Sequence, residues 1–418
     1  MAQLKDDCFA FGGELMPLGD ALALLRQRLT TVTMLEPIPL RSALGRILAE
    51  DIVSPRNVPP HDNSAVDGYA VYFDDLNADR ETRLPVGGRV AAGHPLGRPA
   101  NHGEAVRIFT GAPMPDGMDT VFMEEDCSAE AGVVVLPHGL KRGANRRKRG
   151  EDIVSGDIIM RAGQKLRPQE LGLAASVGRH QLTVQGRLRV AVFSTGDEIR
   201  DPAGDAPDGC IFDSNRFAIM ALLENLGCLV TDLGILADNK EEIAAALIGS
   251  ASQHDVVVTS GGVSAGEEDH VKSAVERNGS IHFWRLAIKP GRPIALGQIA
   301  DAAFVGLPGN PVAAMVTFMV VARPMLQMLN GAADYQTPRY SVRADFDYKK
   351  KIGRREWVRA ILSGDAASEL SAQKFRSSGA GILTSMVAAD GLVELAEHIE
   401  EVAPGDMVDF LPFNEVLQ

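Results

Sequence analysis

The sequence is poor in cysteine and in aromatic residues, and it contains no long uninterrupted hydrophobic run. The chain of 418 residues has only four scattered cysteines, none in a CxxC pair: Cys8, Cys127, Cys210 and Cys228. This usage disfavours a structural zinc site and a disulfide framework, and it fits a reducing cytosol. The longest apolar stretch, residues 311–329, contains an arginine and a proline and predicts a buried helix. The first residues lack a signal-peptide pattern, so we expect a cytoplasmic protein without a membrane partner.

Positive charge is also in deficit. Lys and Arg number 42 against 55 Asp and Glu, which gives a net charge of −13. Nucleic-acid binding needs a basic surface, so we expect no nucleic-acid partner. The GxGxxG and Gly-Lys-Ser/Thr patterns of common nucleotide sites are missing, as is an evident Ser/His/Asp set. Covalent catalysis is therefore disfavoured, whereas a local basic pocket for an anion stays possible.

The composition and the hydrophobic pattern change several times along the chain, as expected for several domains. Residues 187–330 alternate strands and helices and predict a doubly wound α/β domain. Residues 52–150 are rich in Pro, Gly and Val and predict a β-rich domain inserted between the halves of a connecting domain, 1–51 and 151–186. Residues 337–418 alternate polar and apolar side chains and predict a C-terminal β-barrel or sandwich. The predicted fold class is thus a multidomain α/β protein.

Polar loops follow the strands of the α/β region. They include residues 194–198 (STGDE), 260–266 (SGGVSAG) and 307–311 (LPGNP), and Lys289 lies in a fourth, AIKPGRP. Ligands of open parallel sheets bind at the carboxyl ends of the strands. Glycines let backbone amides approach an anion, and a helix start adds unpaired N–H groups. These loops favour a phosphorylated ligand, although each could be an ordinary tight turn.

Acidic residues follow the same strands: Glu198 the first, Asp238 the second and Asp269 the third. Acids beside an anion would repel it unless they bind a cation, accept ligand N–H groups or shape a transition state. A structural alternative exists for Asp238 and Asp269, which could cap the helices predicted after them. Glu198 has no such alternative, because it lies in no predicted helix.

Two other segments allow a structural or a functional interpretation, and a third predicts a helix. Residues 141–152 (KRGANRRKRGED) hold six basic side chains, which either face solvent or clamp an anion. Residues 59–70 carry a polar run before a strand, which could be a turn network. Residues 40–49 (LRSALGRILA) predict a short helix.

Six motifs, in order along the chain, resemble the signature set of the MoeA family, the molybdopterin molybdenumtransferases. The family is related to the gephyrin E domain and to the plant Cnx1 E domain. The motifs are DNSAVDGYA (62–70), TGAPMP (110–115), STGDE (194–198), SGGVS (260–264), AIKPGRP (287–293) and LPGNP (307–311). The resemblance implies four domains and an elongated homodimer. It also implies that adenylylated molybdopterin reacts with molybdate to give molybdenum cofactor and AMP, with Mg²⁺ required.

The resemblance also implies a set of site residues. Positions linked to activity are Asp62, Thr110, Glu198, Asp238, Asp269 and Lys289, of which Glu198, Asp238 and Asp269 are the candidate Mg²⁺ ligands. Candidate substrate-binding residues are Ser260, Gly261, Gly262, Ser264, Arg285, Pro308, Gly309, Asn310, Pro311, Arg147, Asp152, Arg376 and Ser378. Arg147 and Asp152 match a region that faces the partner's pocket in the dimer. Arg285 stands where some members have lysine, and its guanidinium can bind an oxyanion in bidentate fashion.

Other functions are compatible with parts of this pattern. A tungstate-inserting homologue would look the same, and a molybdopterin adenylyltransferase would share the α/β domain but would not need residues 52–150 and 337–418. A scaffold of the gephyrin type would not need the acidic set. Molybdopterin adenylyltransferase and other cofactor-assembly proteins are the partners that we expect beyond a second copy of the chain.

Overall fold

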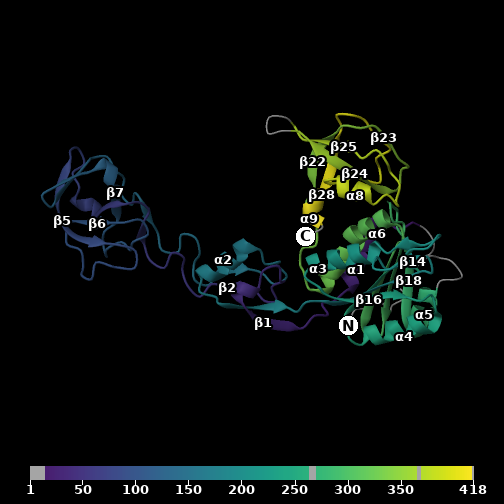
Figure 1. The fold of residues 1–418 in the computed structure, drawn as a ribbon. Helices are drawn as coiled ribbons and strands as arrows, with labels where there is room; N and C mark the ends of the chain where they lie inside the picture. The colour runs from purple at the N-terminus through teal and green to yellow at the C-terminus, as the bar shows by residue number, and fades with distance from the viewer. Residues whose placement is uncertain (1–14, 263–269, 365–368, 417–418) are drawn as a thin grey trace.

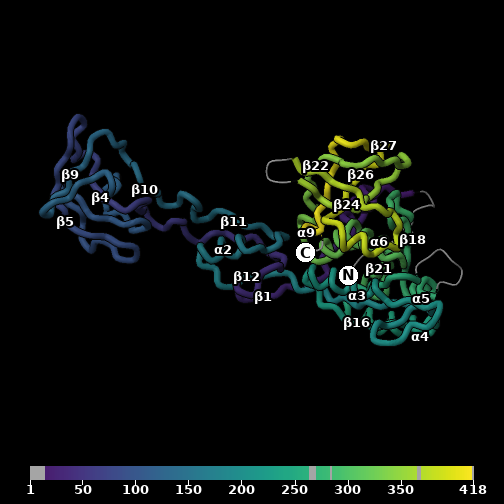
Figure 2. Tube along the Cα trace, turned by 45° about the horizontal axis from the view of Figure 1, so that its top comes forward, coloured from purple at the N-terminus to yellow at the C-terminus, as the bar shows by residue number. Residues whose placement is uncertain are grey.

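The computed structural model describes residues 15–262, 270–364 and 369–416, with the side chains of 283 and 284 left undescribed. The molecule is elongated, and both views show three parts along its length (Figures 1 and 2). A small β module carrying β5, β6 and β7 stands at one end. A slender middle part carries α2 and β1, and the larger body at the other end combines an α/β sheet with a barrel.

The α/β sheet has six strands in the order β16-β13-β17-β21-β20-β18. Four strands are parallel: β16 (Leu229–Leu236), β13 (Arg189–Thr195), β17 (Val256–Ser260) and β21 (Ala302–Leu307). Two antiparallel strands complete it: β20 (Pro293–Ile299) and β18 (Gly279–Arg285). The parallel part brings the carboxyl ends of β13, β17 and β21 to one edge, where the predicted loops follow.

Helices cover both faces of this sheet. Alternate residues of β13 point to opposite sides, so Val190 and Val192 enter one core while Ala191 and Phe193 enter the other. The first core is covered by α1, α3 and the helical run from Pro311 to Leu329, and the second by α4 and α5. The bounds are α1 (Leu18–Arg28), α3 (Asn215–Asn225), α4 (Lys240–Ala251) and α5 (His270–Asn278). This arrangement confirms the doubly wound α/β prediction.

The apolar stretch at residues 311–329 is a helix inside the protein. It runs through α6 (Pro311–Thr317), a π-helical turn η5 (Phe318–Ala322) and α7 (Arg323–Leu329). Of its most apolar window, 89% is buried. The prediction of a buried helix is therefore confirmed, and its apolarity is explained by packing against the sheet.

The C-terminal part is a closed barrel rather than a sandwich. Five strands follow each other as β24-β25-β22-β28-β26, and β26 pairs back onto β24. They are β22 (Tyr340–Ala344), β24 (Arg355–Ser363), β25 (Ser371–Lys374), β26 (Gly391–Leu395) and β28 (Met407–Pro412). The short strand β19 (Ile288–Lys289), which leaves the α/β sheet, pairs with β24, placing Lys289 opposite Glu356. The barrel is thus joined directly to a predicted site residue.

The middle part is made from segments on both sides of the 52–150 region. Strand β1 (Leu35–Pro39) pairs with β12 (Gln181–Gln185), and β2 (Ile52–Val53) pairs with β11 (Ile158–Met160). Helix α2 (Pro168–Ser176) begins at a proline, whose fixed φ suits the first turn of a helix. Chain segments that are far apart in sequence therefore lie side by side between the end module and the larger body.

The end module is a six-stranded sheet in the order β7-β4-β6-β5-β9-β8. Its strands are β4 (Gly68–Val71), β5 (Thr82–Val90), β6 (Ala105–Ile108), β7 (Thr120–Met123), β8 (Ser128–Glu130) and β9 (Val133–Leu136). Apolar residues on its two faces form separate small cores. Both candidate motifs of this region flank its strands: β3 (Asn63–Ser64) precedes β4, and residue 110 follows β6.

The helix predicted over residues 40–49 is wrong. Only one short 3-10 turn forms there, η2 (Leu40–Ser42). Gly45 adopts a positive φ of 75°, which ends any helical path. Ile47 and Leu48 then form β-bridges to Lys165 and Val184, so pairing with the returning chain takes their hydrogen bonds.

Candidate functional site

Two hollows lie where the predicted loops meet. The strand-end pocket, about 940 Å³ in volume, opens at the carboxyl ends of β13 and β17 and at the loop after β21. Its walls include Thr195, Gly196, Glu198, Phe212, Asn215, Asp238, Ser260, Gly261, Gly262, Gly309, Asn310 and Pro311. Loops from several strands therefore build one pocket, as the rule for parallel sheets predicts.

Asn215, the first residue of α3, holds two of these loops together. Its side-chain amide donates to the Ser260 hydroxyl at 2.8 Å and to the Gly309 carbonyl at 2.7 Å. The Ser260 hydroxyl in turn donates to the Pro308 carbonyl at 3.2 Å. These bonds fix the loop after β17 against the loop after β21.

Gly262 meets a steric requirement in the same wall. It adopts a φ of 62°, and a Cβ there would lie 2.7 Å from Thr195 Cγ2 and 2.9 Å from Val271 Cγ2. Both the positive φ and the close approach require glycine. The loop therefore presents bare backbone to the pocket at this point.

Glu198 and Asp238 line the strand-end pocket and are exposed. Neither carboxylate forms a hydrogen bond or ion pair with another residue in the described part of the chain. The capping alternative for Asp238 is wrong, because Asn239 caps α4 by accepting from the amides of Glu241 and Glu242. Both acids are therefore free to meet a ligand or cation.

The third predicted metal ligand, Asp269, lies outside the described residues, as does Ser264. Within residues 15–262, 270–364 and 369–416, no group of three or more His, Cys, Asp or Glu side chains is arranged to hold a metal ion. Any cation held by Glu198 and Asp238 would therefore need further ligands from the substrate, from water or from residues beyond these ranges.

Asp213, which lines the same pocket, has a structural role. It is buried, and its carboxylate accepts from the backbone amide and the Nε of Arg216, at 3.1 and 3.0 Å. Arg216 is also ion-paired with Asp201 and Asp232. Burial opposes the guanidinium charge, but the bonds with the three aspartates outweigh it and raise the pKa of Arg216. The cluster braces the wall formed by β14 (Ile199–Arg200) and β15 (Ile211–Phe212).

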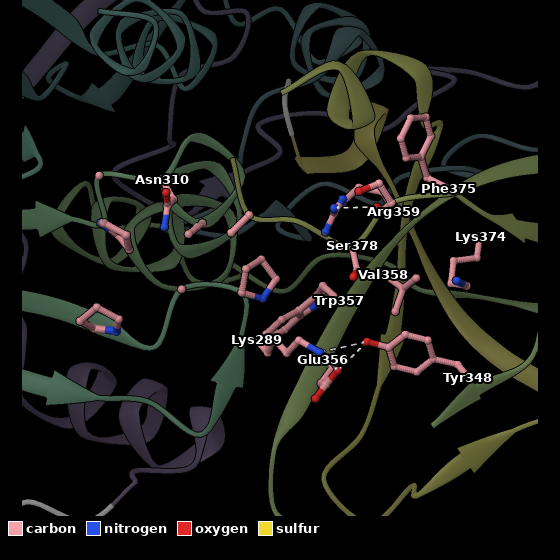
Figure 3. A pocket seen from close by; sticks show the side chains of 18 of the residues that line it. Lys289, Asn310, Tyr348, Glu356, Trp357, Val358, Arg359, Lys374, Phe375 and Ser378 are labelled. Carbon is pink, nitrogen blue, oxygen red and sulfur yellow. Dashed lines mark hydrogen bonds and ion pairs between the residues drawn. The ribbon is translucent and has the colours of Figure 1, made fainter. Parts of the chain in front are cut away.

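The second hollow, the inter-domain pocket, lies between the α/β domain and the barrel (Figure 3). Its volume is about 570 Å³. The α/β side contributes Lys289, Pro290, Pro308 and Asn310, and the barrel side contributes Tyr348, Glu356, Trp357, Arg359, Lys374 and Ser378. Among the charged side chains that line it, three are cationic, Lys289, Arg359 and Lys374, and one is a carboxylate, Glu356.

Lys289, Glu356 and Tyr348 form a bonded trio in this pocket, drawn with dashed lines in Figure 3. Lys289 Nζ lies 3.1 Å from Glu356 Oε2, and the Tyr348 hydroxyl donates to the same oxygen at 2.8 Å. Partial burial opposes the charge on Lys289, but its bonds with Glu356 and Tyr348 raise its pKa. Burial, followed by the bond to Glu356, raises the pKa of Tyr348. The lysine is therefore charged and the tyrosine neutral at neutral pH.

Arg359 supports the loop that carries Ser378. Its guanidinium donates to the Ser385 hydroxyl at 3.0 Å and to the carbonyls of Ser377 and Gly379, each at 3.1 Å. Burial lowers the pKa of Arg359, but an arginine remains charged in proteins. The side chain thus fixes the loop while adding positive charge to the pocket wall.

The two pockets share a wall. Gly261, Gly262, Gly309 and Asn310 line both of them. Asn215 holds the two loops of this wall together. The acids of the strand-end pocket and the cations of the inter-domain pocket therefore lie on opposite sides of these loops.

Most residues predicted in the α/β region and in the C-terminal part meet here, but two described ones do not. Ser260 to Gly262, Pro308 to Pro311, Glu198, Asp238, Lys289 and Ser378 all line one or both pockets. Arg285 and Arg376 are described and exposed, and neither lines either pocket. Arg285 ends β18, which is the antiparallel edge strand of the sheet.

The residues predicted in the end module gather at a separate surface. The Asp62 carboxylate accepts from the Arg149 amide at 2.7 Å and lies 3.4 Å from Arg146. The Thr110 amide and hydroxyl each donate to Asp67 at 2.7 Å, and the bonds from Thr110 lower the pKa of Asp67. The Met114 amide bonds the Asp62 carbonyl, which joins the two motifs.

The basic segment adjoins this surface and divides between the two interpretations. Arg142 is ion-paired with Asp74 and Asp119, so it has a structural role. Arg147, in β10 (Arg146–Arg147), and Asp152 are exposed. Neither they nor Asp62 and Thr110 line the pockets of their own chain.

Sequence reasoning missed Asn215, Tyr348, Glu356 and Lys374. The sequence signal for Glu356 is its position in the largely apolar strand REWVRA, next to a tryptophan. In the structure, Glu356 and Trp357 are both almost fully buried. A carboxylate there requires a partner, and the partner is Lys289.

The doubly wound domain carries loops that can bind an anion, and it packs against a barrel. Together with the distant polar module, this arrangement is that of a multidomain enzyme that acts on a large anionic substrate. Comparison with known families identifies it. Residues 16–178 match the MoeA N-terminal region (domain I and II), 191–328 a probable molybdopterin binding domain, and 341–413 the MoeA C-terminal region (domain IV). The chain belongs to the MoeA family.

Relatives agree over nearly the full length. A molybdopterin molybdenumtransferase of Haemophilus influenzae is 38% identical over 405 residues, covering 96% of this chain and 100% of the relative. Molybdopterin molybdenumtransferase 2 of Mycobacterium tuberculosis is 34% identical and covers 88% and 92%. A crystal structure of a molybdopterin biosynthesis MoeA protein from Pyrococcus horikoshii superposes with a TM-score of 0.82 at 27% identity, covering 96% and 100%. The activity is that of a transferase in molybdenum cofactor biosynthesis, with molybdopterin and molybdate as substrates.

Proposed function

We propose that the molybdopterin reaches the enzyme in adenylylated form, and that molybdenum transfer is coupled to release of AMP. The observation that carries this proposal is the wall shared by the two pockets. A ligand lying across that wall would place an anionic, metal-associated group beside the acids. Its other end would lie among the cations. An adenylylated dithiolene with a pyrophosphate has such a division.

The strand-end pocket suits the pyrophosphate and its counter-ion. Gly261 and Gly262 line it without side chains, so phosphate oxygens can approach the backbone of this loop closely. Mg²⁺ is usually held by one or two carboxylates, with waters and substrate phosphates completing its shell. Glu198 and Asp238 fit that pattern, with Asp269 the third candidate. The ion would neutralise charge on the pyrophosphate.

The inter-domain pocket suits molybdate, a tetrahedral dianion. Lys289 is held charged by its partners and lines the pocket near Ser378. In this proposal Lys289 and Ser378 bind the oxyanion where it meets the dithiolate. Arg376 is exposed beside that loop and would need to turn inward to take part, whereas Arg285 would act at the surface.

The end module completes the proposal through a homodimer. Asp62, Thr110, Arg147 and Asp152 line neither pocket of the same chain, and the end module stands at the opposite end of the molecule from the larger body (Figure 1). In a twofold dimer, the module of one copy would face the pockets of the other. We place the dimer in the cytoplasm, receiving substrate from a molybdopterin adenylyltransferase and passing the product to other cofactor-assembly proteins.

Two alternatives to this function are a homologue that inserts tungstate and a scaffold without catalytic activity. A tungstate-inserting enzyme would use the same residues, and competition between the two oxyanions would separate them. A non-catalytic scaffold would leave Glu198 and Asp238 without a task. Their lack of partners in the described part of the chain favours the enzyme.

The direct test mixes the purified protein with adenylylated molybdopterin, Mg²⁺ and molybdate. We expect AMP release that depends on molybdate, together with activation of an apo-molybdoenzyme. A wild-type protein that yields neither product would contradict the proposed reaction. A wild-type protein that activates the apoenzyme from non-adenylylated molybdopterin equally well would contradict the AMP step alone.

Mixing of variants tests the dimer. Asp62→Ala and Lys289→Met should each be inactive, while random reassociation of the two should restore about a quarter of the sites, as expected for a twofold dimer with shared sites. Sites built within one chain would give no restoration. Light scattering checks that both variants associate like the wild type.

A further inference from the structure

We propose that Lys374 is a second lysine for the oxyanion in the inter-domain pocket, acting opposite Lys289. The proposal rests on the proposed function, because the oxyanion is taken to be molybdate. Lys374 ends β25 of the barrel and lines the pocket. Its Nζ lies 5.9 Å from the centre of the Tyr348 ring, and Lys289 Nζ lies 5.8 Å from the same point (Figure 3).

Lys374 differs from the other cations of the pocket in its bonding. Lys289 is paired with the buried Glu356, and Arg359 bonds two carbonyls and a hydroxyl. The Lys374 ammonium forms no hydrogen bond or ion pair with any residue in the described part of the chain, and it makes a cation–π contact with the Tyr348 ring. An ammonium has three donors and is strongly hydrated. Those donors are available to a ligand.

The charge of the pocket points the same way. Among the described residues, its lining holds three cations, Lys289, Arg359 and Lys374, and one carboxylate, Glu356, so their formal charge is +2. That charge balances a dianion such as molybdate, whereas without Lys374 the lining would carry only one excess positive charge. Most other wall residues are apolar, including Pro290, Trp357 and Val358, and charges interact more strongly in such surroundings than in water.

Tyr348 explains how two like charges are kept in one pocket. The Lys374 ammonium lies over the ring, whose negative face attracts cations, whereas Lys289 Nζ lies 3.3 Å from the hydroxyl oxygen at the far end of the side chain. This hydroxyl is committed to Glu356 on the Lys289 side. The ring therefore separates a lysine that is already paired from one that is not. The latter contributes the added attraction for the anion.

The test compares Lys374→Gln, Lys374→Arg and the control Lys351→Gln. Lys351 is an exposed residue that belongs to the C-terminal part and lines neither pocket, so it matches the charge change. Titration calorimetry with sodium molybdate should show about 10-fold weaker binding for Lys374→Gln, the size expected for losing a bond to a charged group. Lys374→Arg and Lys351→Gln should stay within about 2-fold of wild type. In AMP release, Lys374→Gln should raise KM for molybdate with little change in kcat.

A purely structural Lys374 would lower the melting temperature of Lys374→Gln and leave its molybdate affinity unchanged, which would overturn the proposal. An equal loss in Lys351→Gln would overturn it too, because the effect would belong to the general field. Lys374→Met, which keeps the apolar stem, serves if the glutamine variant fails to fold. Wild-type molybdate binding that depends on Lys374, without AMP release, would defeat the proposed function and leave the lysine assignment standing. Normal turnover and unchanged molybdate binding in Lys374→Gln would defeat the lysine assignment and leave the proposed function standing.

Discussion

The strand-end pocket and the inter-domain pocket are neighbours with opposite charge. One side of their shared wall carries Glu198 and Asp238, and the other carries Lys289, Arg359 and Lys374. The acids are exposed and unpartnered among the described residues, whereas Lys289 is held by a buried carboxylate. Opposite charges are thus kept apart by backbone rather than allowed to neutralise each other. This separation lets a cation and an oxyanion approach one ligand from different sides.

The origin of the two pockets differs as well. The strand-end pocket is built almost wholly by loops that follow neighbouring strands of one sheet. The inter-domain pocket needs the barrel, which supplies Tyr348, Glu356 and Lys374. Chemistry that depends on the second pocket is therefore sensitive to how the barrel docks, through the pairing of β19 with β24.

The largest effect should come from Lys289→Met. Removing the ammonium leaves the Glu356 carboxylate, which is 1% exposed, without its nearest cation, and it removes the proposed oxyanion ligand. Molybdate-dependent AMP release should fall by about 100-fold or more. Steady-state kinetics measures it, with Lys289→Arg as the charge-preserving control. An active Lys289→Met variant would break the assignment of the oxyanion to this side of the wall.

Glu198→Ala and Asp238→Ala come next and act on the other pocket. Because neither acid has a partner in the described chain, folding should be unaffected, while turnover drops by about 10- to 100-fold and more Mg²⁺ is needed for half-maximal rate. Molybdate binding by calorimetry should stay at the wild-type value. If these variants lost molybdate affinity instead, the division of labour between the pockets would be wrong.

Gly262→Ala should damage both pockets together, because Gly262 belongs to the wall. The new Cβ would meet Thr195 and Val271 below 3 Å at a positive φ, and we expect a destabilisation of about 1–3 kcal/mol. Urea unfolding measures it. Gly353→Ala is a matched control, since Gly353 has a φ of 84° and nothing within 4 Å of its Cβ position. Equal losses in the two variants would show that only backbone strain matters at Gly262.

The smallest effect is the pH dependence of the Lys289 pair. The pKa of Lys289 is raised in the folded protein, so its contribution to stability is complete below the unfolded pKa and is lost as pH rises through the folded value. Between pH 6 and 9 the stability difference between wild type and Lys289→Gln should be constant, and it should shrink above about pH 10.5. A difference that vanished near pH 8 would show that the lysine is not held charged.

The sequence predicted the α/β region well because its signals are local. The alternation of strands and helices expected over residues 187–330 is present, as in α4 (Lys240–Ala251) followed by β17 (Val256–Ser260). Apolar runs and glycine-rich loops follow directly from the periodicity of a doubly wound sheet. The helix predicted at 40–49 failed because its hydrogen bonds go to distant chain segments, at Lys165 and Val184.

The site was predicted in part for the same reason. Loops after parallel strands converge by rule, so Ser260, Gly309 and Glu198 could be placed together. The residues that the barrel contributes could not be predicted. The alternation of polar and apolar residues in β24 shows which side chains face inward but not which ones contact another domain. Glu356 and Lys374 became evident only once β24 and β25 were seen beside Lys289. Asp62 and Thr110 resemble family positions, and their roles remain a prediction.

One measurement addresses the division between the pockets directly: a crystal soaked with AMP, Mg²⁺ and tungstate, whose anomalous signal marks the oxyanion. We expect the phosphate of AMP against Ser260 and Gly261, with the cation beside Glu198 and Asp238. The tungstate should lie between Lys289 and Lys374, across the glycine wall. Oxyanion and phosphate in the same pocket, or tungstate bound away from both lysines, would contradict the account.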